Sequence, residues 1–332
     1  VSGSRHSGLF RPRHADDMKL GLHGGHLCPC LCVPGRNSGD AAGHGGQRGR
    51  TAPLHRIEDP DSGGHEIRIV KIEPLVGLLF PRCCPVCSQI VLPEGALICS
   101  GCVPKLHFIQ QPSCKKCGTE LISDRAEYCP DCLRRQRSFE SGVALIRYDT
   151  VAQKSIAAVK YKNRREYLDF YAEAIARRYG YFFKCHKDAV LVPVPVHPAR
   201  LRSRGFNQAG ELAVRLGRLT GLPVNERLLV RTKKTAPQKE LGPDERLRNL
   251  RHAFAVAAEF RQEPAQDKTD SRRMPGRTAS VPAGKAAKLP QTVILADDIY
   301  TTGSTIEACA RVLKAAGVRQ VYFVSICIGS SL

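Results

Sequence analysis

One stretch of this sequence, residues 289–317, predicts a strand, a tight loop and a helix in direct succession. The strand is the short apolar run 293–296, which is typical of a parallel strand buried on both faces. Asp297 and Asp298 follow where the strand leaves the sheet, and a helix over residues 306–316 ends at a glycine. A buried parallel strand joined to a helix predicts an α/β fold with helices flanking the sheet.

The loop between this strand and helix carries the groups that an anion site needs. Backbone N–H groups at a helix start, with hydroxyls beside them, suit a phosphomonoester, and the acid pair before them suits vicinal hydroxyls or a metal. Together they predict a site for a sugar phosphate. The loop consists of Tyr300, Thr301, Thr302, Gly303, Ser304 and Thr305.

Other phosphate-binding motifs do not fit this loop. A P-loop requires a lysine that is missing here, and a dinucleotide fingerprint requires more glycines. A strand-turn-helix with a threonine-rich N-cap is the plain alternative, and the acid pair argues against it. Residues 297–305 resemble the phosphoribosyl pyrophosphate (PRPP) loop of type I phosphoribosyltransferases. The resemblance implies that Asp297 and Asp298, the expected catalytic residues, face the ribose hydroxyls, and that Thr301–Thr305 surround the 5′-phosphate.

Four Cys-x2-Cys pairs lie upstream, in two repeats with a period of thirty residues and eleven residues between the pairs of each repeat. Each pair can point two sulfurs at one ion, so two pairs complete a tetrahedral Cys₄ site, and zinc is the expected metal. Residues 82–134 therefore predict a double zinc ribbon with about two structural zinc ions. The ligands are Cys84, Cys87, Cys99, Cys102, Cys114, Cys117, Cys129 and Cys132.

Disulfides are the main alternative for these cysteines. The chain shows no secretion signal, and thiols stay reduced in the cytosol, which disfavours disulfides and predicts a cytoplasmic protein. Redox activity would need only one pair. Pairing within each repeat is the simplest assignment, and a cross-braced pairing is left open. Cys83 is expected to be a spare.

The second domain, residues 140–332, is expected to open with a strand over residues 142–148, followed by helices over 151–161 and 166–179. A buried strand over residues 190–196 then delivers a basic loop at its carboxyl end. Ligands of open α/β sheets bind at such strand ends.

Three arginines alternate in that basic loop. Arg200, Arg202 and Arg204 can surround a pyrophosphate with bidentate contacts, although such a pattern alone is more often plain surface. Asn207 is the expected cap of the following helix. A second basic cluster is either a solvated helix end or faces phosphate, and the sequence leaves this open. It consists of Lys160, Lys162, Arg164 and Arg165.

Taken in order, these motifs resemble the ComF/GntX family over about residues 76–332. That family is associated with DNA uptake in bacterial competence and, in other members, with gluconate use. The resemblance rests on the double zinc ribbon, PVPVHPARLRSRGFNQA, the PRPP loop, and the spaced residues Arg231, Thr235, Gln238, Leu241, Arg246 and Asn249.

The resemblance implies a type I phosphoribosyltransferase-like parallel sheet and a transferase that binds PRPP with Mg²⁺. It implies a lid over residues 233–243, with Lys234 and Gln238 on the pyrophosphate beside Arg200 and Arg204. The acceptor has no recognisable signature. The alternative function is a non-catalytic competence factor that binds PRPP, a nucleotide or single-stranded DNA, with competence-machinery proteins as further partners.

One segment lies outside this resemblance, and one segment within it departs from the family pattern. Residues 1–75 are expected to be disordered or an over-extended reading frame, and residues 259–289 are expected to be a disordered insertion. No segment is apolar enough to span a membrane. The formal net charge of +20 would fall to +16 with two Zn²⁺ on eight thiolates, and it favours anionic partners without choosing among them.

Overall fold

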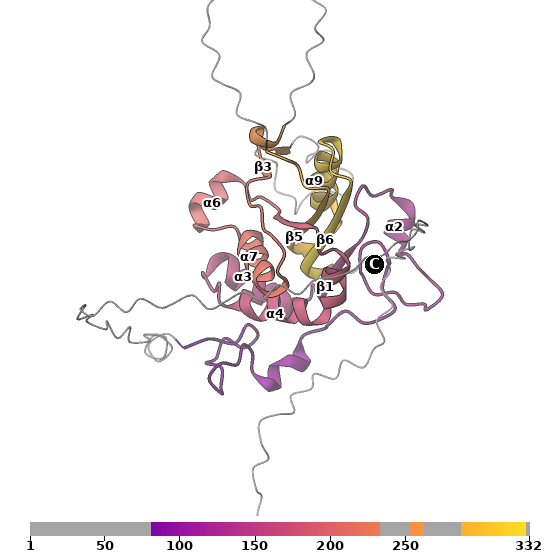
Figure 1. The fold of residues 1–332 in the computed structure, drawn as a ribbon. Helices are drawn as coiled ribbons and strands as arrows, with labels where there is room; N and C mark the ends of the chain where they lie inside the picture. The colour runs from indigo at the N-terminus through magenta and orange to yellow at the C-terminus, as the bar shows by residue number, and fades with distance from the viewer. Residues whose placement is uncertain (1–80, 233–252, 262–286, 330–332) are drawn as a thin grey trace, which may run out of the picture. The chain divides into compact units, whose positions relative to one another are not determined.

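The computed structural model describes residues 81–232, 253–261 and 287–329 (Figure 1). The expected tail over residues 1–75, the expected lid over residues 233–243 and most of the expected insertion over residues 259–289 lie outside the described residues.

The chain forms a four-stranded sheet in the order β1-β6-β5-β2, in which every neighbouring pair is parallel. A separate antiparallel pair, β3-β4, precedes β5 in the sequence. The predicted fold class, a parallel sheet flanked by helices and preceded by a ribbon module, is confirmed. The strands are β1 (Gly142–Arg147), β2 (Val190–Pro193), β3 (Leu229–Arg231), β4 (Phe254–Val256), β5 (Thr292–Tyr300) and β6 (Gln320–Ile328).

The helices follow the amphipathic segments of the sequence, with differences near residue 180 and after β2. The helix expected over residues 166–179 ends at Arg178, and Gly180 opens a further short helix, because Phe182 and Phe183 are apolar and pack into the core. The helices are α2 (Pro130–Arg134), α3 (Thr150–Tyr161), α4 (Tyr167–Arg178), α5 (Gly180–Cys185), α6 (Pro198–Arg204), α7 (Gln208–Thr220) and α9 (Ser304–Ala315), with 3₁₀ turns at Ser100–Lys105 and Ala258–Phe260.

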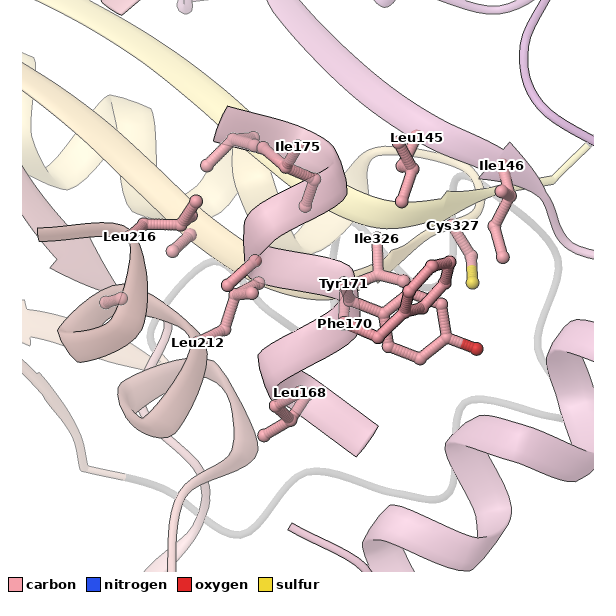
Figure 2. Packing of buried hydrophobic residues seen from close by; sticks show 14 of the residues in the cluster. Leu145, Ile146, Leu168, Phe170, Tyr171, Ile175, Leu212, Leu216, Ile326 and Cys327 are labelled. Carbon is pink, nitrogen blue, oxygen red and sulfur yellow. The ribbon is translucent and has the colours of Figure 1, made fainter. Parts of the chain in front are cut away.

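Both faces of the sheet are buried, as the continuous apolar strands predict. On β5, Ile294 and Ala296 face the cluster beneath α4 and α7, whereas Val293 and Leu295 face the cluster beneath α9. Figure 2 shows the first cluster, in which Leu168 and Tyr171 of α4 pack beside leucines of α7 and the β1 and β6 side chains. Packing on both faces of the sheet therefore positions the ends of the strands and the helices that lie against them.

The ribbon module repeats its structure as well as its sequence. An isolated antiparallel bridge joins Cys83 to Ile90, and an equivalent bridge thirty residues later joins Ser113 to Glu120. Ser88 and Gly118 occupy equivalent positions and both have positive φ. Among the described residues, no helix has the length and apolar character needed to cross a membrane.

Candidate functional site

The acid pair lies at the carboxyl end of the sheet, but inside a strand. The sequence predicts that the strand stops before Asp297; instead β5 continues to Tyr300, because β6 pairs with it along its full length, including Asp297 with Ser325. Strand β2 ends sooner, where Pro193 pairs with Ala296. The two acids therefore stand just beyond the end of a neighbouring strand, which is where α/β sheets bind ligands.

Strand alternation turns the two acids toward opposite faces of the sheet. Asp298 lies on the α3 side, where the Lys160 ammonium is 2.5 Å from its Oδ2 atom. Asp297 lies on the α9 side, where its charge raises the pKa of the buried Cys309 thiol beyond the effect of burial itself. Each acid thus has its own set of neighbours.

Burial dominates the electrostatics of this pair. Burial, and then repulsion from Asp298, raises the pKa of Asp297 well above its ordinary value, although Lys160 acts in the opposite direction. The Oδ1 atom of Asp297 accepts a 2.9 Å hydrogen bond from the backbone N–H of Asp298. Burial alone would lower the pKa of Lys160, but the charges of Asp298 and Asp297 outweigh it and raise that pKa.

The loop after β5 forms a compact cradle at the start of α9. Gly303 is the N-cap and adopts φ +70°, a left-handed conformation that glycine takes without strain. The hydroxyls of Thr302 and Ser304 are 2.9 Å apart, and Thr301 is exposed. The first N–H groups of a helix have no partners within the helix, so hydroxyls and amide donors converge where the helix dipole is positive.

Tyr300 lies beneath this cradle. Its ring is buried and stacks on Phe323 with 4.8 Å between centroids. A Cβ atom on Gly303 would come 2.3 Å from the Tyr300 hydroxyl, so the glycine is required by close approach as well as by its φ angle. The tyrosine thus supports the loop from the core side.

Of the second basic cluster, one member faces the acids and the others face elsewhere. Lys160 extends from the last turn of α3, with 18% of its side chain exposed. Arg164 pairs with Glu166, and Arg165 lies over the Phe206 ring at 4.1 Å. Of this cluster, Lys160 lies at the acid pair, where it contacts the Asp298 carboxylate.

The basic loop after β2 is a helix rather than a loop. Helix α6 forms because Pro198 stands at its first position, His197 caps it through a 3.1 Å bond from the Ala199 N–H, and Gly205 ends it at φ +80°. Positions four apart share a helix face, so Arg200 and Arg204 lie together and Arg202 turns away.

The two arginines of the shared face have different neighbours. The Arg204 guanidinium lies 5.5 Å over the Tyr161 ring and bonds to Gln208, and its charge reaches Lys160. Arg200 is exposed, and its charge reaches Arg231. The predicted helix cap at Asn207 is confirmed, since its Oδ1 accepts from the Ala209 N–H at 3.2 Å.

Arg231 was not among the predicted site residues, yet it lies near Asp297. Burial and the charge of Arg200 lower its pKa, while Asp297 has the opposite effect. Its guanidinium lies 5.3 Å from the Phe254 ring centroid. The available signal was its place among the spaced residues on which the family resemblance rests. The predicted residues Lys234 and Gln238 lie outside the described residues.

The eight ribbon cysteines form two separate clusters, and each repeat supplies one. In each cluster the four sulfurs lie within 4.8 Å of one another. The Sγ atoms of Cys87 and Cys99 are 3.9 Å apart, and those of Cys117 and Cys129 are 3.7 Å apart. Tetrahedral thiolates at a Zn–S distance of about 2.3 Å stand about 3.8 Å apart, so both clusters fit structural zinc.

The pairing within each repeat is thereby confirmed over the cross-braced alternative. The members are Cys84, Cys87, Cys99 and Cys102 in one cluster, and Cys114, Cys117, Cys129 and Cys132 in the other. Cys83 belongs to neither, and its sulfur accepts a long contact of 3.7 Å from Arg164.

Comparison with known proteins gives matches to both parts of the chain. A family profile described as double zinc ribbon domain matches residues 75–133. Competence protein F of Haemophilus influenzae is 26% identical over 232 residues, covering 68% of this chain and 87% of that protein. Competence protein ComFC of Streptococcus pneumoniae is 22% identical over 237 residues, covering 69% and 86%. DNA utilization protein YhgH of Escherichia coli K12 is 25% identical over 256 residues, covering 75% and 98%.

The fold and the two cysteine clusters define an α/β protein that carries a double zinc ribbon before a parallel sheet. The matches to relatives extend well beyond the ribbon. The chain is therefore similar to competence proteins and DNA utilization proteins over 68% to 75% of its length.

Proposed function

We propose that this protein binds PRPP with Mg²⁺ and transfers the phosphoribosyl group to a nitrogenous acceptor. The observation that carries the proposal is the order of groups along one backbone segment: two buried carboxylates, then a hydroxyl-rich loop, then the N-terminus of α9. The domains are residues 82–134 for the ribbon and residues 140–332 for the phosphoribosyltransferase-like part.

The cradle and the acid pair would share the ligand between them. The 5′-phosphate would accept hydrogen bonds from the hydroxyls and amides of Thr301–Thr305, at the positive end of α9. Asp297 and Asp298 would accept from the ribose hydroxyls, or hold water on Mg²⁺, which prefers carboxylate oxygens and retains part of its water shell. Mg²⁺ would supply charge neutralisation on the pyrophosphate.

The cations around the acids fit the pyrophosphate side of such a ligand. Arg200 and Arg204 share a face of α6, and Arg231 approaches from β3. Lys234 and Gln238 are proposed to join them. Arginine suits this role, because its planar fork binds phosphate oxygens bidentately and stays charged.

The transfer itself needs positioning more than acid–base chemistry. The bond from the anomeric carbon to pyrophosphate breaks, and pyrophosphate leaves with the electron pair. The acceptor nitrogen forms the new bond to that carbon and loses its proton to solvent. Neutralising the leaving group and aligning the reactants are the contributions expected of this site.

Release of pyrophosphate from Mg²⁺-PRPP tests the transfer, with a panel of nitrogenous bases as acceptors. The proposal predicts release that depends on one class of base and is lost in Asp297→Asn. Saturable binding of Mg²⁺-PRPP without release under any base would contradict the transfer and leave a PRPP-binding protein.

A second function is favoured by the surface beside the site. Tyr161 is 78% exposed at the end of α3, where Arg204 lies over its ring. Lys154, Lys162 and Arg164 line a hollow together with it. An exposed aromatic ring among cations is the arrangement that stacks and tracks single-stranded nucleic acid. The relatives named as competence and DNA utilization proteins support such a role in DNA uptake.

A gel-shift titration with single-stranded DNA tests this function, run at several salt concentrations with and without Mg²⁺-PRPP. Tyr161→Ala should weaken DNA binding. PRPP should displace the DNA, because Arg204, which is proposed to bind the pyrophosphate, lies over the Tyr161 ring. Tyr128→Ala, which removes an exposed ribbon tyrosine, is the control and should have no effect. Binding that resists PRPP and depends on Tyr128 would move the DNA site to the ribbon.

A further inference from the structure

The segment that joins the second zinc ribbon, which holds the cluster of Cys114, Cys117, Cys129 and Cys132, to β1 contacts the loop after β5 directly. That loop, residues 301–305, is called the phosphate-type loop below. One nitrogen of the Arg137 guanidinium bonds to the carboxylate of Asp131 and donates a 3.0 Å hydrogen bond to the backbone carbonyl of Thr302. The Arg137 side chain is only 2% exposed. A buried charged donor that bridges two groups holds both of them in place.

The next residue of the junction holds the first turn of α9. The backbone N–H of Ser138 donates to one oxygen of Glu307 at 2.8 Å, and its hydroxyl donates to the other, also at 2.8 Å. Glu307 is 1% exposed, and Arg311 donates a third bond to its carboxylate at 2.6 Å. The start of the helix that forms the cradle is therefore fixed from the ribbon side.

The third residue, Phe139, lies under the loop. It is fully buried and meets the rings of Tyr300 and Phe323 edge-on, with centroids 6.4 and 5.1 Å away. Tyr300 in turn lies against Gly303. Three consecutive residues thus contact the loop carbonyl, the helix start and the aromatic support beneath the glycine.

The second cysteine cluster holds Asp131, the residue that pairs with Arg137. Asp131 stands between Cys129 and Cys132, both members of that cluster. A module this small takes its fold from its metal, so the position of Asp131 depends on the intact Cys₄ site. The ribbon backbone is also tied to β1, since the Gly142 N–H donates to the Lys116 carbonyl at 2.9 Å.

We infer that the second zinc ribbon positions the phosphate-type loop, and that Arg137 is the positioning residue that links them. This inference rests on the proposed function, in which that loop binds the 5′-phosphate of PRPP. The ribbon is then part of the ligand site although it contributes no group to the ligand. The first ribbon has a different attachment: it contacts α4, through Arg82 with Asp169 at 2.5 Å and through Ser88 with Tyr167.

This difference supplies matched variants. Arg137→Met keeps the apolar stem and removes the guanidinium. Asp131→Asn is isosteric, leaves the cysteines in place and removes the charge that Arg137 pairs with. Arg82→Met makes the same change as Arg137→Met on the first ribbon and serves as the control. Arg137→Lys keeps the positive charge but lacks the planar guanidinium, so it should preserve part of the positioning that Arg137→Met loses.

Two measurements on the full-length protein test the inference. Hydrogen exchange of the free protein should show the amides of residues 302–307 exchanging about tenfold faster in Arg137→Met and Asp131→Asn, as expected from losing a buried hydrogen bond to a charged group. Calorimetry with Mg²⁺-PRPP should show a Kd raised about tenfold or more in the same variants. Arg82→Met should leave both unchanged, and all variants should retain equal zinc.

Unchanged exchange and unchanged affinity in Asp131→Asn and Arg137→Met would overturn the inference. If Arg137→Met fails to fold, the isosteric Asp131→Asn decides. If the unmodified protein does not bind PRPP, the proposed function fails, and the exchange comparison still decides whether the ribbon positions the loop. Faster exchange in Arg82→Met to the same extent would mean a general loss of stability and would also contradict the link.

Discussion

The Nζ atom of Lys160 lies 2.5 Å from the Oδ2 atom of Asp298, which joins the last turn of α3 to the carboxyl end of β5. Both side chains are largely buried, at 18% and 7% exposed. Lys160 therefore pairs with Asp298 on one face of the sheet, whereas on the opposite face burial is the main cause that raises the pKa of Asp297. The two acids therefore differ: Asp298 is paired with a cation, and Asp297 has a raised pKa.

Replacing Lys160 by methionine should destabilise the fold, because it leaves the Asp298 carboxylate buried without its partner. A loss of about 3 kcal/mol in the free energy of unfolding is expected in urea denaturation. The double variant Lys160→Met with Asp298→Asn should recover most of it. Lys154→Met, on the exposed side of the same helix, is the control. Equal stability of Lys160→Met and Lys154→Met would show that the pair contributes nothing.

Asp297 should make stability depend on pH with a definite sign. Its pKa is raised in the folded protein, so its contribution is complete below the ordinary carboxyl pKa and is lost as pH rises through the folded value. Asp297→Asn has no such loss. Over the pH range above the ordinary carboxyl pKa of about 4, the unfolding free energy of the unmodified protein should fall relative to that of the variant. Urea denaturation of both proteins across this range measures it, and parallel profiles would contradict it.

The cysteine clusters predict about two zinc ions per chain. Cys99→Ser should lose about one equivalent, because three thiolates forfeit much of the binding energy that folds the first ribbon. Cys83→Ser, which alters a cysteine outside both clusters, should keep both ions. Elemental analysis of purified protein gives the count. Less than one equivalent in the unmodified protein, or cysteines recovered as disulfides, would refute the assignment.

Much of the fold follows from local patterns. The spacing of the cysteines predicts the ribbons, because a knuckle is a local structure whose ligands are near in sequence. The continuous apolar runs predict a buried parallel sheet, because only strands covered on both faces need them. The end of β5 was missed, since its continuation past Asp297 depends on pairing with β6, which lies later in the chain.

The details of the site depend on contacts that sequence spacing does not encode. The signals for α6 were present in Pro198 and Gly205, but the alternating arginines favoured a loop interpretation. The direction of Lys160 depends on where α3 ends over the sheet. The contact of Arg137 with Thr302 joins positions far apart in the chain, so no local motif predicts it.

Titration calorimetry tests the central claim most directly. It measures the binding of Mg²⁺-PRPP to the unmodified protein and to Asp298→Asn. Asp188→Asn, which changes an exposed aspartate away from the sheet end, is the control. The account predicts binding near one equivalent per chain that Asp188→Asn retains. It predicts an affinity at least tenfold weaker in Asp298→Asn, because the amide loses charge-assisted hydrogen bonds to the ribose. Equal affinity in all three proteins would place the ligand away from the acid pair and contradict the account.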